Sequence, residues 1–384
     1  MSTVLSAARA QTSTRPSPSP GYPDFAYPIL AFSQLCEELV SSSARMRLHA
    51  LAQTARLMHG KPPIEFIGGA AHPSTVVADF PMAKLLRYEP LGKKRAGSVV
   101  VVASLINKYY VLDLLPEISV IRGYQERGFS VYVLDWKAPG ADGPKQGFVD
   151  YVDGAIAQAV NHAAGAEGAP PHLLGYCMGG TMAAMYAARK PDAIRTLTLL
   201  AAPIDFHQTG VLSDWTKRER FDADLVVDAL GNMPPWLMQS GFKLMSPVDQ
   251  IIKPLRTLLD GADADRIRHV TALEAWLDDN MSFAGGLYRQ YIKGLYQENA
   301  LVNGTFRIAG TVVDLRKITA PLLNVIALRD HIAAPASSLV IQNLVASADR
   351  EVLEYETGHI GLTASRRTIE KLWPKVYGWV EARG

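Results

Sequence analysis

Residues 173–181, Leu-Leu-Gly-Tyr-Cys-Met-Gly-Gly-Thr, constrain the fold more than any other stretch of this chain. An apolar run meets a turn bracketed by glycines and then a series of small residues, which is the pattern of a buried strand, a sharp turn and a helix. The layout is typical of a nucleophile elbow, with Cys177 where hydrolases usually carry serine. Gly175 and Gly179 would let strand and helix pass closely while the thiol points outward. A thiolate is a good nucleophile and a good leaving group, so it suits acyl transfer between thioesters.

Short apolar runs alternate with amphipathic segments on both sides of this turn. We predict strands at residues 99–103, 130–135, 172–175, 196–201, 322–328 and 351–355, and helices at residues 116–127, 148–164, 179–189, 336–345 and 368–381. This alternation predicts an α/β fold with a mostly parallel, doubly wound sheet. Ligands on such sheets bind at the carboxyl ends of the strands, which is where the turn at Cys177 falls.

The pattern also divides the chain into segments, which we place at residues 1–28, 29–97, 98–204, 205–310 and 311–384. The first, with prolines alternating with serines, is predicted to be a disordered tail. The second is predicted to be an N-terminal helical extension, because apolar residues recur at helical spacing through its first half. The third and fifth form the α/β core. The fourth, rich in aromatic residues and Met, is predicted to be a helical cap inserted over the site, and its aromatic side chains fit either an ordinary core or an apolar channel for an acyl chain.

Composition excludes several classes of protein. Cys36 and Cys177 are the two cysteines of the chain, which rules out a disulfide framework and favours the reducing cytoplasm. Neither has a Cys or His partner at metal-ligand spacing, so we expect no metal. A net charge of +2, without clusters of basic and aromatic residues, gives no support for nucleic-acid binding. No apolar run reaches the roughly 20 residues of a transmembrane helix.

A thiol nucleophile needs a base, and the base needs an acid that orients it. In the chain order of α/β hydrolases, the acid follows the nucleophile after a later strand and the histidine comes last. Asp330 follows the predicted strand 322–328, and His359 follows the predicted strand 351–355 in a loop between two glycines. We therefore predict Cys177, Asp330 and His359 as nucleophile, acid and base.

Each of these residues alone has a plainer explanation, and each has rivals. A lone cysteine is usually a small core residue, and Asp330 could simply cap the segment that follows it. Asp314 is a rival acid on the cap side of the last strands. His331, beside Asp330, and His207, at the start of the cap, are rival bases, although we expect His331 to pack or cap locally.

Acyl transfer also requires hydrogen-bond donors for the oxyanion that develops on the carbonyl. One donor should be the backbone amide of Met178, directly after the nucleophile. The second is expected from the loop after the first predicted strand, residues 104–109, at Ile106 or Asn107; we take Ile106.

Several segments together resemble the polyhydroxyalkanoate (PHA) synthase family. They are residues 106–114 (Ile-Asn-Lys-Tyr-Tyr-Val-Leu-Asp-Leu), the elbow box at residues 175–179 around Cys177, and residues 296–299, 312–315, 329–332 and 358–360. The resemblance implies an α/β-hydrolase-fold acyltransferase that polymerises (R)-3-hydroxyacyl-CoA, in particular 3-hydroxybutyryl-CoA, and releases CoA. It implies that Cys177 carries the growing chain as a thioester, that His359 deprotonates Cys177, and that Asp330 helps His359 activate the incoming 3-hydroxyl.

The same resemblance implies the partners of the protein. Coenzyme A enters as part of the substrate and no cofactor is expected, while the surface of a cytoplasmic PHA granule and a homodimer are. The chain length is nearer that of the short synthases, which work with a second, non-catalytic subunit, whereas residues 106–110 look more like the long single-subunit ones. The subclass therefore stays open. Ala333-Ala334-Pro335 stands where the family often has a bulkier pair, which we expect to reshape the site without removing its chemistry.

Two other functions fit the same residues less fully. An intracellular PHA depolymerase or an acyl-CoA thioesterase would use the same nucleophile, acid and base, with water in place of the hydroxyacyl acceptor. A non-catalytic granule-associated or regulatory paralogue would need none of Cys177, Asp330 and His359, so their presence in order argues against it.

Overall fold

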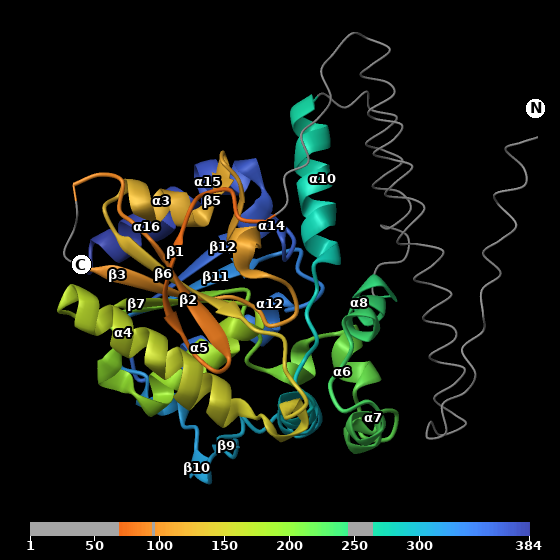
Figure 1. The fold of residues 1–384 in the computed structure, drawn as a ribbon. Helices are drawn as coiled ribbons and strands as arrows, with labels where there is room; N and C mark the ends of the chain where they lie inside the picture. Colours follow the sequence, from red (N-terminus) through yellow and green to blue (C-terminus); the bar gives the residue numbers. More distant parts are fainter. Residues whose placement is uncertain (1–68, 94–96, 245–263) are drawn as a thin grey trace, which may run out of the picture.

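The computed structural model describes residues 69–93, 97–244 and 264–384, so the predicted tail and the helical pattern at 29–59 lie outside it. Its centre is an eight-stranded sheet with the order β1-β2-β6-β3-β7-β8-β11-β12 (Figure 1). The strands are β1 (Thr75–Asp79), β2 (Ala83–Tyr88), β3 (Ser98–Val102), β6 (Ser130–Trp136), β7 (His172–Tyr176), β8 (Leu197–Leu200), β11 (Leu322–Ala327) and β12 (Arg350–Tyr355). From β6 to β12 every pairing is parallel, which confirms the predicted α/β class.

Helices cover both faces of this sheet (Figure 1). One face carries α5 (Met178–Arg189) and α4 (Ala157–Glu167), the latter continuing from a π-helix, η5 (Val149–Ile156). The other face carries α3 (Val120–Glu126) and α16 (Trp373–Glu381). Smaller elements complete the core at η3 (Tyr109–Leu112), β4 (Asp113–Leu115), β5 (Ile118–Ser119), α12 (Pro335–Leu339), α13 (Ile341–Leu344), α14 (Gly361–Ala364) and α15 (Arg366–Lys371). Because both faces of β3 are buried, its sequence Ser-Val-Val-Val-Val does not alternate between apolar and polar residues.

Part of the predicted N-terminal extension, residues 29–97, belongs to the sheet instead. Residues 75–88 form β1 and β2, which are paired antiparallel, and β2 is also antiparallel to β6. The prediction of helix is therefore wrong for this part, and the sheet begins at Thr75 rather than at residue 98. The signal in the sequence is weak because β1 is a five-residue edge strand, largely exposed and interrupted by a bulge between Val76 and Ala78.

The insertion between β8 and β11 is helical in its described part. It contains α6 (Val211–Trp215), α7 (Ala223–Leu230), α8 (Pro235–Leu244), α10 (Ala264–Asp278), α11 (Gly285–Gln290) and a second π-helix, η8 (Tyr291–Gln297), before a small hairpin of β9 (Arg307–Ile308) and β10 (Thr311–Val312). Figure 1 shows α6, α7, α8 and α10 standing together beside the sheet. Among the described residues, no helix is both long and apolar enough to cross a bilayer.

A buried histidine at the opposite end of the strands from Cys177 gives the fold a sensitivity to acid. His172 opens β7, shares a hydrogen bond of 2.8 Å between its Nδ1 and Thr196 Oγ1, and packs edge-on against Phe129. Burial, helped by the nearby charge of Arg195, lowers the pKa of His172 to about 4. The folded protein therefore holds this imidazole neutral at pH values where the unfolded chain protonates it.

We expect this histidine to make stability fall with acidification. Above the ordinary pKa of 6.5 its contribution is complete; between 6.5 and about 4 the unfolded state binds one more proton than the folded state. The unfolding free energy should therefore drop by about 1.4 kcal/mol per pH unit across that window. Urea titrations of wild type and His172→Gln at a series of pH values measure the slope. His172→Gln should lose it, while the exposed-site control His207→Gln should keep it; an unchanged slope in His172→Gln would refute the assignment.

Candidate active site

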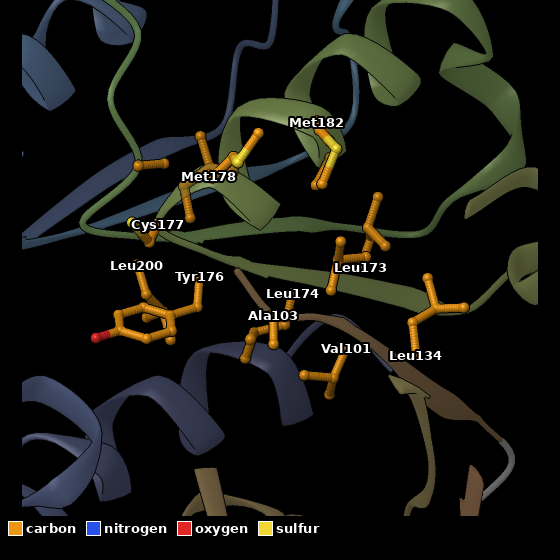
Figure 2. Close-up of a cluster of buried hydrophobic side chains, with 14 of the residues drawn as sticks. Val101, Ala103, Leu134, Leu173, Leu174, Tyr176, Cys177, Met178, Met182 and Leu200 are labelled. Atoms are coloured by element: carbon orange, nitrogen blue, oxygen red, sulfur yellow. The ribbon is translucent and has the colours of Figure 1, made fainter. Parts of the chain in front are cut away.

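The turn at Cys177 is a strained elbow between β7 and α5. Cys177 has φ 57° and ψ −127°, a conformation rare for a residue with a side chain. Its backbone is fixed on both sides, since its amide donates to the Leu200 carbonyl at 2.9 Å and its carbonyl accepts from the Gly180 amide at 2.8 Å. Figure 2 shows Cys177 at the point where the strand gives way to the helix, between Tyr176 and Met178.

Glycines around the elbow allow neighbouring backbone segments to approach more closely than any side chain at these positions would permit. A Cβ on Gly179 would overlap the Val102 carbonyl oxygen, and a Cβ on Gly175 would overlap the Cα of Gly180. The first contact joins α5 to the end of β3, and the second joins β7 to α5. These glycines therefore place the start of α5 directly above the ends of two central strands.

Asp330 and His359 meet at the carboxyl end of the sheet, from the loops after β11 and β12. Asp330 Oδ2 lies 2.6 Å from His359 Nδ1. Its other oxygen, Oδ1, accepts from the amides of Ile332 at 2.8 Å and Ala333 at 2.9 Å. Asp330 is 4% exposed and both of its carboxylate oxygens accept hydrogen bonds, so the side chain is held in this orientation. Ala333 stands where the family that the sequence resembles often has a bulkier residue. Its contact with Asp330 is made by its backbone amide, which does not depend on the side chain.

The imidazole of His359 is hydrogen-bonded to Asp330 and lies close enough to Cys177 for the charge of the sulfur to act on it. Burial by itself disfavours a charge on the ring, but the negative charges of Cys177 and Asp330 and the hydrogen bond to Asp330 outweigh it. Together they raise the pKa of His359 to about 10. With Nδ1 held by Asp330, the nitrogen available to the thiol is Nε2. The site is therefore built to stabilise a protonated His359 ring.

The rival residues lie elsewhere. Asp314 caps the 3₁₀ turn η9 (Leu315–Lys317) and is ion-paired with Arg316. His207 is exposed, with its amide bonded to the Asp205 side chain. His331 is exposed beside the buried Asp330. Of the predicted acids and bases, the structure thus brings only Asp330 and His359 to the thiol, and their chemical roles belong to the proposal below.

The two predicted oxyanion donors differ in their surroundings. Met178 is the first residue of α5, where backbone amides have no partner within the helix and the helix dipole favours negative charge. The Ile106 amide lies in the loop after β3 and donates to Ser104 Oγ at a long 3.3 Å. Its carbonyl accepts from the amide of Met281, in the cap. The second donor therefore sits in a loop that both the core and the cap hold.

Three tyrosines around the thiol were not singled out by the sequence. The Tyr176 ring stacks on the His359 ring with centroids 5.2 Å apart, and its hydroxyl donates to the His359 carbonyl at 3.3 Å. Tyr291 and Tyr296, both in η8, pack on each other 5.5 Å apart. Burial above all, and then neighbouring charges including Cys177, raise the pKa of each well above its ordinary value. Tyr176 could have been found from its place inside the elbow box; the other two are reached only through the folding of the cap.

Among the described residues, no group of three or more His, Cys, Asp and Glu side chains has a geometry that could hold a metal ion. The chemistry that these residues themselves offer is acyl transfer through a buried thiol.

The fold and the geometry of this turn define the class: an α/β-hydrolase-fold protein whose strained elbow between strand and helix carries a cysteine. Residues 106–363 match the family described as "alpha/beta hydrolase fold", and residues 34–124 match "Poly-beta-hydroxybutyrate polymerase (PhaC) N-terminus". Solved structures give the same fold, among them a monoacylglycerol lipase from Paleococcus ferrophilus with a TM-score of 0.52, 17% identity, and coverage of 78% of this chain and 99% of that one.

Curated relatives narrow the class to a family. The poly(3-hydroxyalkanoate) polymerase subunit PhaC of Allochromatium vinosum is 33% identical, over 83% of this chain and 91% of the relative. The PhaC subunits of Haloferax mediterranei and Haloarcula marismortui are 36% and 35% identical over 81% of this chain. These matches cover 64% and 68% of the relatives' own lengths. The chain belongs to the PHA polymerase (PhaC) family, which confirms the family and the fold predicted from its motifs.

Gly179→Ala should disrupt the elbow rather than merely soften it. The added methyl group has no space against the backbone of Val102, so α5 must shift away from the end of β3. We expect a loss of about 3 kcal/mol or more in unfolding free energy, measured by urea denaturation. Gly165→Ala is the matched control, because Gly165 lies in α4 with nothing within 4 Å of a new Cβ and should gain up to about 1 kcal/mol. Similar stabilities for the two variants would contradict the packing described.

Asp330→Asn should lower the pKa of His359 while leaving its packing in place. The amide removes one of the two negative charges that hold the imidazolium. The ring protons of His359, followed by NMR against pH, report the change directly. We also expect slower alkylation of Cys177 by iodoacetamide at neutral pH, since a less basic imidazole is a weaker acceptor for the thiol proton. An unshifted titration of His359 would show that Asp330 does not support the charge.

Proposed function

We propose that this protein is an acyltransferase that polymerises (R)-3-hydroxyacyl-CoA, in particular 3-hydroxybutyryl-CoA, into polyester with release of CoA. The observation that carries the proposal is the buried Cys177 thiol on its strained elbow, beside an imidazole that is hydrogen-bonded to Asp330. Membership of the PhaC family supports the substrate class. Coenzyme A is part of the substrate, and the steps below need no further cofactor.

In the first half-reaction, His359 takes the proton of the Cys177 thiol, and the thiolate attacks the carbonyl of the acyl-CoA thioester. The amides of Met178 and Ile106 receive the negative charge on the carbonyl oxygen. The bond to the CoA sulfur breaks, CoA leaves with the proton held on His359, and the acyl group remains on Cys177 as a thioester. The carboxylate of Asp330 keeps the ring oriented and balances its charge throughout.

In the second half-reaction, His359 takes the proton from the 3-hydroxyl of an incoming hydroxyacyl-CoA. The oxygen attacks the acyl carbonyl on Cys177, an ester bond forms, and the thiolate is released and regains its proton from His359. The lengthened chain can then return to Cys177 with loss of CoA. Each cycle therefore adds one ester and frees one CoA.

Exclusion of water favours transfer to a hydroxyl over hydrolysis. Cys177 is 8% exposed, and the aromatic rings of Tyr291 and Tyr296 from the cap lie around it. A thioester formed there is shielded from bulk solvent while a bound hydroxyacyl group is held beside it. We further propose that the protein works as a homodimer at the granule surface in the cytoplasm, and the assay below includes a second synthase subunit as a possible partner.

The direct test mixes purified protein with (R)-3-hydroxybutyryl-CoA and follows free CoA, turbidity and the products. We expect CoA release together with insoluble polyester, with or without an added second subunit. Release of CoA with free 3-hydroxybutyrate as the only product would identify the protein as a thioesterase and refute the synthase proposal.

Cys177→Ala should reduce turnover to background, since no other thiol lies among the described residues. Cys177→Ser should fold and turn over poorly, because an alkoxide is harder to form and leaves less readily than a thiolate. The same CoA assay measures both variants, with circular dichroism to check folding. Wild-type activity in Cys177→Ala would refute the mechanism.

A further inference from the structure

The loop that follows β3 is bonded to the cap by a set of contacts that the chemical steps do not use. Asn107 Nδ2 donates to Asn280 Oδ1 at 2.6 Å, and the backbones of these two residues form an antiparallel bridge. In that bridge the Met281 amide donates to the Ile106 carbonyl at 3.2 Å. One side of the Ile106 backbone is therefore bonded directly to the cap.

Two further bonds join the same short segments. Trp276 Nε1 donates to the Lys108 carbonyl at 2.7 Å, and the Tyr110 hydroxyl donates to Asp279 Oδ2 at 2.8 Å. The two donors are buried, Trp276 at 5% exposed and Tyr110 at 7%, whereas the acceptor Asp279 is exposed. Residues 106–110 of the core are thus bonded repeatedly to residues 276–281 at the end of α10, some 170 positions along the chain.

The cap side of this contact is itself well held. The Leu277 carbonyl, in the last turn of α10, accepts from Asn280 Nδ2 at 2.7 Å and from Gln239 Nε2 of α8 at 3.0 Å. The side-chain bonds to the core are longer: the Ile106 amide lies 3.3 Å from Ser104 Oγ, Lys108 Nζ 3.4 Å from Asp135 Oδ1, and the Tyr109 hydroxyl 3.3 Å from the Tyr88 hydroxyl. The shorter bonds of Asn107 and Lys108 are therefore those to the cap.

An oxyanion donor is useful only when it is placed within a few tenths of an ångström, because its hydrogen bond must form as the charge develops. We propose that Asn107, Trp276 and Asn280 are positioning residues that latch the oxyanion loop to the cap, so that the Ile106 amide faces the Cys177 acyl carbonyl only while the cap is seated. The inference rests on the proposed function of Cys177 and Ile106 and adds a requirement to it. Acyl transfer is then coupled to closure over the substrate, and an unseated cap leaves a thiol without a complete oxyanion hole.

The test separates reactions that need an oxyanion hole from one that does not. Acetylation of Cys177 by p-nitrophenyl acetate passes through an oxyanion and is followed as a burst of p-nitrophenol. Alkylation of the same thiol by iodoacetamide is a direct displacement at carbon and forms no oxyanion. Both reactions are measured on Asn280→Ala, Trp276→Phe, Asn107→Ala and the double variant Asn107→Ala/Asn280→Ala. Gln239→Ala is the matched control, because it removes a bond to the same helix end from within the cap.

We expect the burst rate of Asn280→Ala and Trp276→Phe to fall at least about tenfold, part of the 10²–10³ that a whole oxyanion donor supplies. Their rate of alkylation should stay at the wild-type value. Gln239→Ala should match wild type in both reactions. The double variant should be no slower than the slower of Asn107→Ala and Asn280→Ala, because each removes the same contact.

Bursts at the wild-type rate in the latch variants would overturn the proposal, and so would equal slowing of burst and alkylation, which indicates general damage to the thiol site. A wild-type protein that is alkylated normally but gives no burst would also overturn it. The polymer assay is read separately: a confirmed latch in a protein that makes no polyester leaves the latch standing and refutes the synthase.

Discussion

The strained backbone at Cys177 is the feature on which the remaining geometry of the site depends. A residue with a side chain held in this conformation costs on the order of 1–3 kcal/mol, and it persists because its surroundings determine it fully. Here the amide is bonded to β8, the carbonyl is bonded to the first turn of α5, and Gly175 and Gly179 allow strand and helix to touch. The strain directs the thiol out of the sheet, toward the loops that bring His359 and Asp330.

Charge is the second level of organisation. The raised pKa of His359 means that the site stabilises the ring once it carries a proton. Asp330 is held by two backbone amides as well as by the histidine, so the supporting charge is fixed rather than mobile. Through Asn280 and Trp276 the cap is also bonded to the loop that carries Ile106, the second oxyanion donor of the proposed mechanism. The cap that covers the thiol is thus bonded to the same loop from which the proposed mechanism takes its second oxyanion donor.

Much of this could be predicted from the sequence, because the signals are local. The valine run of β3, the glycine-bracketed box at Cys177, and the order of Asp330 and His359 after their strands each report a nearby constraint. The antiparallel strands β1 and β2 could not, since β2 pairs with the distant β6 and β1 is a short, largely exposed edge strand that pairs only with β2. Tyr291, Tyr296 and the Asn107–Asn280 contact were equally out of reach, because they depend on residues more than a hundred positions apart meeting in the folded chain. The proposed second oxyanion donor is a backbone amide, which leaves no side-chain signature in the sequence.

The central claim is that Cys177 carries the acyl group as a covalent thioester. The most direct measurement stops the reaction with (R)-3-hydroxybutyryl-CoA by acid within the first turnovers and maps the digested protein by mass spectrometry. The account predicts that the peptide containing Cys177 gains mass in whole 3-hydroxybutyryl units, and that hydroxylamine removes them, as it cleaves thioesters. Release of CoA while that peptide stays unmodified at every time point would contradict it.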